Sequence, residues 1–414
     1  MTPRRIVVGG WIVFLLYAWP GYLETDGAEQ LAVAASRGGR FDDWHAVVMT
    51  EIWRMVGRVV AGPAGMLVLQ SGLLVWGTFA ILRRVTGERT AAWCAVGSLL
   101  FPPLINTTGL VSAEAQLAGF FVAGIAGLLS SRRPYRWLGL GALVLGVGMR
   151  DGVALAALPI VLGLWPWRRR PLALVAWVAI ALAAFGLERA CTNKHTLQPE
   201  ERLAHNDIAN ILRNAPPITD AHLRDVLAGT PLRFDSDIQQ HAVDRERLFD
   251  ANSTTPERAA MIAARRRLIR EEPAAWLVHR ARRLHAELEP PPALYTSFVS
   301  SEAEARAINH WSRHSLVQRA LIAPVRWLSG TVLFRPYLYA ILALVLLPLA
   351  IAWRQRVAIV VLASGLLYEL SLAVVSTRPA YRDSHWMIVA TVLATVLLVI
   401  HRARPESIDE KPGV

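Results

Sequence analysis

Charged residues inside apolar stretches are the residues of this sequence most able to do chemistry. Arg150 and Asp151 interrupt an apolar stretch that runs from Trp137 to Pro166. A charge at membrane depth is costly, and it usually pairs with another charge or binds an ion. Arg150 is therefore a candidate anion-binding residue. The alternative is that Arg150 and Asp151 pair with each other or cap the helix that follows.

A second charged group lies in the short sequence RPAYRDSHW, directly before the last apolar stretch. It contains Arg378 and Arg382, and a guanidinium group binds phosphate or carboxylate through two parallel hydrogen bonds. We expect Arg378 and Arg382 to hold an anionic group such as a phosphate, a carboxylate or a lipid headgroup. The alternative is that both arginines extend along the membrane surface without a specific partner.

The third charged group follows the first apolar stretch. It contains Asp26 and, further on, Asp42, Asp43 and His45. A carboxylate at such a place can act as a general base. Asp26 also has a structural interpretation as a helix N-cap that is completed by Glu29. Asp42 and Asp43 have one as the start of a second helix.

These groups suit one class of reaction if the fold brings them to one face. A carboxylate can take the proton of an incoming nucleophile, and arginines can stabilise a departing phosphate. The elements that position these groups therefore matter as much as the groups themselves.

The composition indicates a polytopic, all-α membrane protein. Of the 414 residues 54% are hydrophobic and only 18% are charged, whereas a soluble protein carries about 25% charged residues. The net charge of +12 comes from arginine clusters between apolar stretches, so we do not expect a nucleic-acid partner. A membrane-spanning helix needs roughly 20 apolar residues. We predict ten spans, the fifth and sixth of them short: 6–23, 63–82, 91–110, 115–130, 137–149, 152–167, 171–187, 334–353, 357–375 and 386–400.

Arginine placement predicts the orientation of these spans, because cytoplasmic loops are enriched in arginine and lysine. With both termini in the cytoplasm, every inner loop is basic. This arrangement predicts four parts. They are an N-terminal membrane domain (1–187) with a first outer loop (24–62) that forms two juxtamembrane helices, a helical extracytoplasmic segment (188–335), C-terminal membrane helices (336–401) and a cytoplasmic tail (402–414). The histidines of segment 188–335 lack metal-binding spacing, so we expect them on its surface. We also expect the arginines of 265–283 on a solvated or headgroup-facing helix face.

In this order, the elements resemble the GT-C superfamily of membrane glycosyltransferases, which includes protein O-mannosyltransferases and lipid A aminoarabinose transferases. The similar features are the early acidic residue in YLETDGAEQLAVAA, the Asp-x-His element at Asp43, the arginine turn GMRDGVALAALP, the helix IREEPAAWLVHRARRL and the turn RPAYRDSHW. The resemblance covers most of the chain as architecture, and its motifs are short.

The resemblance implies a glycosyltransferase of a bacterial inner membrane, acting at the outer face. It would move a sugar from a polyprenyl-phosphate carrier to an unknown glycan, lipid or protein acceptor. By this analogy Asp26 would deprotonate the acceptor, and Arg150 and Arg382 would hold the departing polyprenyl phosphate. Some family members use a divalent cation, and Asp26, Asp42, Asp43 and His45 could supply ligands for Mg²⁺ or Mn²⁺.

Two differences from the relatives bear on this assignment. Gly27 follows Asp26 where many relatives have a second acidic residue, and Ala46 follows His45 where bacterial relatives often have proline. Both differences fit a family member whose general base lies at another position, or a member that has lost activity.

Two non-enzymatic alternatives remain, a lipid or glycan transporter and a membrane assembly factor. The sequence shows no internal symmetry of the kind that transporters have.

Overall fold

Helices form all the regular elements of the part of the chain that the structure, a computed structural model, describes. A single parallel β-bridge joins Tyr22 and Leu110. The described residues are 1–36, 46–150, 152–164, 170–191, 199–216, 218–232, 254–290, 293–298, 314–376 and 380–403. The predicted all-helical class is thus confirmed for these residues.

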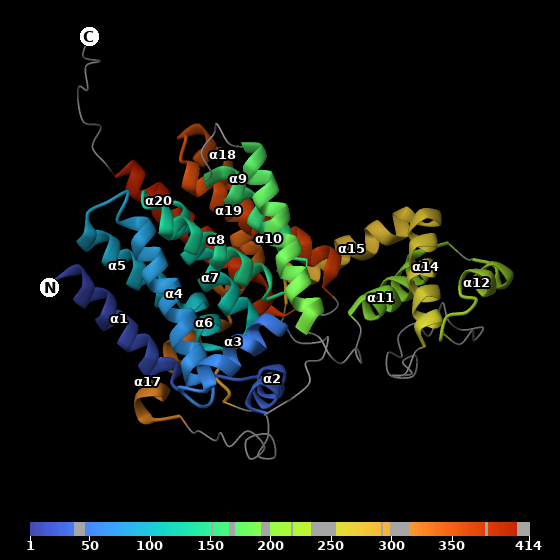
Figure 1. Cartoon of the computed structure of the whole chain (residues 1–414), viewed down its shortest axis with the longest axis horizontal. Coiled ribbons are helices and arrows are strands. Elements are labelled where there is room, and N and C mark those ends of the chain that lie inside the picture. The colour runs from blue at the N-terminus through green and yellow to red at the C-terminus, as the bar shows by residue number, and fades with distance from the viewer. Residues whose placement is uncertain are drawn as a thin grey trace, which may run out of the picture.

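Most of the helices form one bundle, and a smaller group projects from one side of it (Figure 1). The bundle contains α1 (Pro3–Ala18), α4 (Ala64–Leu82), α5 (Glu88–Leu99), α6 (Pro102–Gly109), α7 (Ala113–Leu128), α8 (Arg133–Val147), α9 (Ala154–Leu164), α10 (Arg170–Cys191), α17 (Leu316–Ser329), η2 (Val332–Phe334), α18 (Pro336–Ala352), α19 (Arg356–Val375), η3 (Tyr381–Ser384) and α20 (His385–Arg402). Two short helices, α2 (Thr25–Ala35) and α3 (Val47–Gly57), pack against each other where α1 and α4 are joined. They correspond to the two helices expected in the first outer loop.

Three helices of the described residues are long and apolar enough to cross a membrane. They are α4, α19 and the continuous segment Tyr381–Arg402, and four apolar helices are shorter. The stretch 91–110, expected as one span, is instead split into α5 and α6. Phe101 between them has an extended backbone, because the residue before a proline avoids the helical conformation and Pro102 begins α6.

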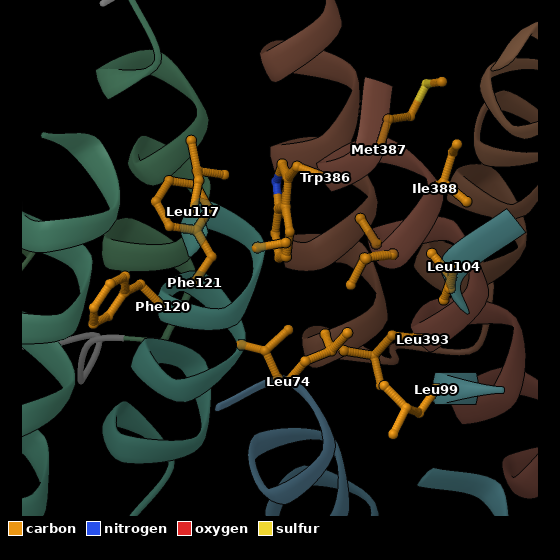
Figure 2. Packing of buried hydrophobic residues seen from close by; sticks show 14 of the residues in the cluster. Leu74, Leu99, Leu104, Leu117, Phe120, Phe121, Trp386, Met387, Ile388 and Leu393 are labelled. Atoms are coloured by element: carbon orange, nitrogen blue, oxygen red, sulfur yellow. The ribbon is translucent and has the colours of Figure 1, made fainter. Parts of the chain in front are cut away.

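The core of the bundle lies where α4, α5, α6, α7 and α20 meet (Figure 2). The rings of Phe121 and Trp386 pack edge to face with centroids 5.1 Å apart, the geometry that aromatic pairs favour. Leu74, Leu104 and Leu393 belong to the same cluster, and all these side chains are buried. This packing fixes the start of α20 beside α7.

Small residues let α7 and α8 approach closely. A Cβ atom added to Gly127 of α7 would lie 2.7 Å from both the Cα of Gly139 in α8 and the carbonyl oxygen of Tyr135. Such contacts between small residues are a common way for helices to pack in membranes. The close approach also fixes the direction of α8, whose far end leads to Arg150.

Buried polar groups lock α6 to the loop after α15 (Pro273–Leu288) and to α20. Asn106 donates a hydrogen bond to the carbonyl oxygen of Ala293 (2.9 Å) and accepts one from the backbone N–H of Tyr295 (2.9 Å). The hydroxyl of Thr107 lies 2.6 Å from Nδ1 of His385. Buried polar groups need such partners, so these bonds hold residues 293–298 against the bundle.

The projecting group, which we name the outer arm, consists of α11 (Pro199–Asn214), α12 (Asp220–Val226) and α14 (Thr255–Glu271), with α15 joining it to the bundle (Figure 1). Its apolar core is separate from that of the bundle. At its centre the fully buried Asp207 accepts hydrogen bonds from Arg280 and from Arg265 (2.6 Å). Nε2 of His279 lies 3.3 Å from the same carboxylate.

This buried cluster corrects two expectations about segment 188–335. His205 and His279 are buried, so the expectation that the histidines lie on the surface is wrong for these two. Arg265 and Arg280 neutralise Asp207 rather than forming a solvated face. Burial alone would raise the pKa of Asp207, but the bonds from His279, Arg280 and Arg265 hold it below its usual value.

We predict that Gly127→Ala destabilises the bundle by about 1–3 kcal/mol, because the added methyl group meets backbone atoms of α8 that cannot move independently. Thermal unfolding in detergent measures the effect. The matched control is Gly141→Ala on the exposed side of α8, where no atom lies within 4 Å. That variant should be neutral or slightly stabilised. Equal melting temperatures for the two variants would contradict the packing argument.

Candidate functional site

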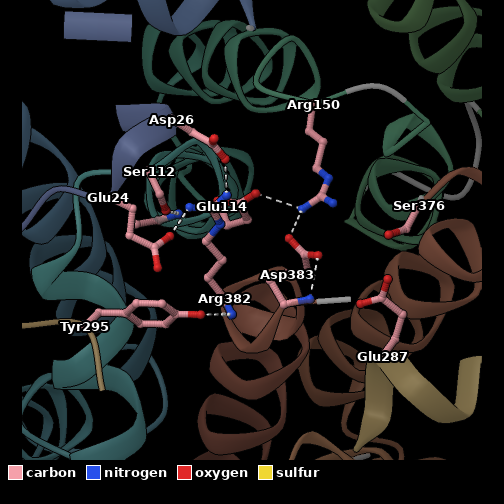
Figure 3. A network of polar contacts seen from close by, with 12 residues as sticks. Glu24, Asp26, Ser112, Glu114, Arg150, Glu287, Tyr295, Ser376, Arg382 and Asp383 are labelled. Atoms are coloured by element: carbon pink, nitrogen blue, oxygen red, sulfur yellow. Dashed lines mark hydrogen bonds and ion pairs between the residues drawn. The ribbon is translucent and has the colours of Figure 1, made fainter. Parts of the chain in front are cut away.

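The candidate site begins with Arg382, which binds two carboxylates from the segment that follows α1 (Figure 3). Its Nη1 donates to Glu24, and its Nη2 donates to Oδ2 of Asp26 at 2.7 Å. Glu24 and Asp26 lie at the start of α2, and Arg382 lies in the η3 turn before α20. The contact therefore joins segments more than 350 residues apart in the sequence.

Arg150 makes the second half of the network. Its Nη1 lies 2.7 Å from both Oε1 of Glu114 and Oδ1 of Asp383. Glu114 stands in the first turn of α7, where the hydroxyl of Ser112 caps the helix. Because Asp383 follows Arg382 directly, the two halves of the network meet at η3 (Figure 3).

Hydrogen bonds to the backbone hold the turn η3, which carries Arg382, in place. The backbone N–H of Arg382 donates to the hydroxyl of Tyr295 at 3.0 Å. Oδ2 of Asp383 accepts from the backbone N–H of Ala380 at 3.2 Å. Tyr295 is itself fixed by Asn106 of α6. The turn that carries Arg382 and Asp383 is thus positioned by α6 and by the loop after α15.

The network runs from an exposed end to a buried end. The side chain of Asp26 is 52% exposed and that of Glu24 is 39% exposed, whereas that of Asp383 is only 6% exposed. Four carboxylates face two guanidinium groups, so the network as a whole carries excess negative charge. Burial raises the pKa of Glu24 above its usual value, although Arg382 opposes the rise.

A further buried carboxylate lies next to this network. Glu287 of α15 has no exposed surface, and its nearest cation is Arg283, with Nη2 to Oε1 at 3.9 Å. Figure 3 shows it between Ser376 and Asp383. Burial, together with the charge of Asp383, raises the pKa of Glu287 to about 7. Near neutral pH this residue therefore holds a proton in part of the molecules.

Three of the residues predicted from the sequence come together. Asp26 contacts Arg382 directly, and Arg150 joins them through Asp383. The interpretation of Asp26 as an N-cap is wrong, because Glu24 occupies that position and α2 has no side-chain cap bond. Arg150 has partners of its own in Glu114 and Asp383. Five residues that the sequence analysis named lie outside the described residues: Asp42, Asp43, His45, Asp151 and Arg378.

Sequence reasoning missed Glu24, Glu114 and Asp383 as members of the site. Glu114 offered a usable signal, since it is the only charged residue of α7 and charges at such positions need partners. Asp383 lay within the quoted turn RPAYRDSHW without a role. Their common function is to neutralise the two arginines, which only the folded arrangement reveals.

The described residues offer no metal centre. No group of three or more histidine, cysteine, aspartate or glutamate side chains among them could hold a metal ion. Asp26, the one described member of the proposed Mg²⁺ or Mn²⁺ ligand set, binds Arg382 instead.

Comparison with known proteins adds no assignment. No family model matches the chain, and neither does any curated protein or solved structure. The geometry of this network is therefore the basis for a proposed function.

We predict that Arg150→Met destabilises the protein by about 3–5 kcal/mol, because it leaves the buried carboxylates Glu114 and Asp383 side by side without their cation. Equilibrium unfolding in mild detergent measures the loss. Adding Glu114→Gln and Asp383→Asn should restore most of it. As a control, Arg136→Met removes an exposed arginine that donates to the carbonyl oxygen of Ser130, and it should change stability by less than about 0.5 kcal/mol. Wild-type stability of Arg150→Met would contradict the network.

We also predict that Glu287 makes stability depend on pH. Its pKa is about 7 in the folded chain against a usual value of 4.5, so between these values the folded state holds a proton that the unfolded state has lost. The free energy of unfolding contributed by this group should therefore fall as pH rises through that window.

Unfolding measured at several pH values from 4.5 to 8 tests this sign. Glu287→Gln should flatten the fall, whereas Glu88→Gln, which removes an exposed carboxylate at the start of α5, should keep the wild-type slope. Parallel curves for wild type and Glu287→Gln would show that Glu287 does not titrate in this window.

Proposed function

We propose that the chain is a membrane glycosyltransferase that moves a sugar from a polyprenyl-phosphate carrier to an extracytoplasmic acceptor. The observation that carries this proposal is the convergence of Asp26, Arg150 and Arg382 in one network. These residues come from three distant segments. Together they provide a partly exposed base beside cations, the pair of functions that displacement of a phosphate leaving group requires.

In the proposed reaction, the acceptor hydroxyl attacks the anomeric carbon of the sugar. The new carbon–oxygen bond forms as the bond to the phosphate oxygen breaks, and the polyprenyl phosphate leaves with that electron pair. Asp26 takes the hydroxyl proton. Attack from the face opposite the leaving group inverts the anomeric configuration. Glu24 shares Arg382 with Asp26, and its raised pKa makes it the second candidate for the base.

The ion pairs add a step to this proposal. Arg382 neutralises Glu24 and Asp26 as the network stands, and an arginine-bound carboxylate is a weak base. A carrier phosphate that takes over Arg382 would release these carboxylates. Binding of the donor would then switch on the base, which limits proton transfer to the loaded site.

The membrane setting belongs to the same proposal. We propose ten spans with both termini in the cytoplasm of a bacterial cell, which places the network at the outer face of the inner membrane. The acceptor would be a glycan, lipid or protein. The supporting observation is that Glu114, at the start of α7, meets Arg150, which follows α8, whereas the arginine cluster 132–136 stands at the opposite ends of these two helices.

A second candidate, a non-enzymatic transporter or assembly factor, is favoured by one observation. Arg150 and Arg382 each already bind two carboxylates, so the network can serve as a brace between helices. In that case its charges would contribute stability alone. A transfer assay separates the two candidates.

We predict that Asp26→Asn leaves the protein folded and lowers transfer by about 10²–10⁴-fold, the usual contribution of a general base. Glu24→Gln should have a smaller effect if Asp26 is the base, and the larger one if the roles are reversed. The assay incubates membranes that contain the protein with a panel of polyprenyl-phosphate pentoses and hexoses and a total lipid and glycan extract. It measures release of polyprenyl phosphate by mass spectrometry.

The control variant is Asp220→Asn, which removes an exposed carboxylate of the outer arm and should keep full activity. Full activity of both Asp26→Asn and Glu24→Gln would remove the first outer loop as the source of the base. If the folded wild-type protein releases no polyprenyl phosphate from any donor, the result would favour the second candidate, in which the network only braces the helices.

A further inference from the structure

Helix α17 has an unusual surface, because its exposed side is apolar. Leu316 is 77% exposed and Trp327 is 78% exposed, and Ala320 and Ala323 lie exposed between them. The opposite side packs on the bundle through Ile322 and Val325. A helix at a water-facing surface would carry polar residues on its outer side.

Helices near α17 also expose apolar residues. The helix lies against α1 and α6 (Figure 1), and Gln318 donates a hydrogen bond to the carbonyl oxygen of Trp19 at the end of α1. On α1, Leu16 and Trp19 are exposed, and on α18, beyond η2, so are Leu344 and Val345. Exposed apolar side chains on α17 and on these neighbouring helices fit lipid chains better than water.

Two arginines border this apolar side. Arg319 and Arg326 are exposed and stand two turns apart, about 10.5 Å along the helix axis. Neither side chain makes an ion pair with any residue in the described ranges. No aspartate or glutamate occurs anywhere between His314 and Tyr368. Within the described residues, these two cations therefore have no carboxylate partner.

From these observations we infer that α17 lies in the plane of the membrane surface and binds anionic lipid headgroups. Leu316 and Trp327 would enter the acyl-chain region, and Arg319 and Arg326 would contact headgroup phosphates. An amphipathic helix of this kind binds through buried apolar area together with attraction to anionic lipid. This inference rests on the membrane placement proposed above and is independent of glycosyl transfer.

The depth of α17 is tested by nitroxide labels in reconstituted vesicles, starting from the full chain with Cys94→Ser and Cys191→Ser. Labels are introduced by Leu316→Cys and by Trp327→Cys. Power-saturation measurements compare collisions with oxygen, which concentrates in lipid, and with a water-soluble nickel chelate. Both labels should collide mainly with oxygen.

Two reference labels make the outcome decisive. Leu344→Cys on α18 reports the lipid phase, and Ala263→Cys, exposed on the outer arm, reports water. If the label at 344 lies in lipid while those at 316 and 327 behave like the one at 263, α17 is not an interfacial helix. If the label at 344 also lies in water, the membrane placement itself fails.

The headgroup contact is tested by a bimane fluorophore introduced through Ala323→Cys, between the two arginines. Its quenching by dibrominated phosphatidylglycerol is compared with quenching by dibrominated phosphatidylcholine. The anionic lipid should be preferred by about fivefold for each arginine. The double variant Arg319→Gln with Arg326→Gln should lose this preference.

The matched control is Arg266→Gln with Arg270→Gln, which removes the same charge from exposed positions of the outer arm and should keep the preference. An equal loss in both double variants would assign the effect to net charge and overturn the headgroup contact. Equal quenching by the two lipids in the protein that keeps both Arg319 and Arg326 would also overturn the headgroup contact.

Discussion

The arrangement of this protein depends on one constraint, which is that two arginines beside apolar helices need negatively charged partners. Arg150 follows α8 and Arg382 precedes α20, and each needs counter-charge where water is scarce. The chain supplies it from distant segments, with Glu24 and Asp26 for one and Glu114 and Asp383 for the other. The network therefore joins the start of α2, the start of α7, the end of α8 and η3.

The same logic links the outer arm to the bundle. Asp207 is buried at the centre of the arm and is neutralised by Arg280, whose other nitrogen donates to the carbonyl oxygen of Ala373 at the end of α19 (3.3 Å). Further along α15, Glu287 is buried beside Asp383. One helix therefore contacts both ionic clusters, so a change in its position would affect the arm and the candidate site together.

Much of the fold follows from the sequence. Long apolar stretches between arginine clusters predict the helices, and they also predict which helix ends lie on the same side of the bundle. Asp26, Arg150 and Arg382 were also predictable as a group, since each is a charge at the expected outer end of an apolar stretch. Their partners were not. Whether Glu114 pairs with Arg150 depends on the crossing of α7 and α8 at Gly127 and Gly139, a three-dimensional contact that spacing along the chain does not encode. The prediction that the histidines and arginines of the outer arm lie on its surface was wrong for a related reason. Only the packing of α11, α14 and α15 buries Asp207 and the side chains that bind it.

We propose that Arg382 exchanges its carboxylate partners for a carrier phosphate. The most direct measurement is a cryo-electron microscopy structure of the full chain in nanodiscs with a polyprenyl phosphate, beside one with the corresponding polyprenol. We expect a phosphate within hydrogen-bond distance of Arg382 or Arg150, with the carboxylate of Asp26 released, and the unchanged network in the polyprenol sample. A phosphate bound elsewhere while Arg382 keeps Glu24 and Asp26 would contradict it and would leave the network as a structural brace.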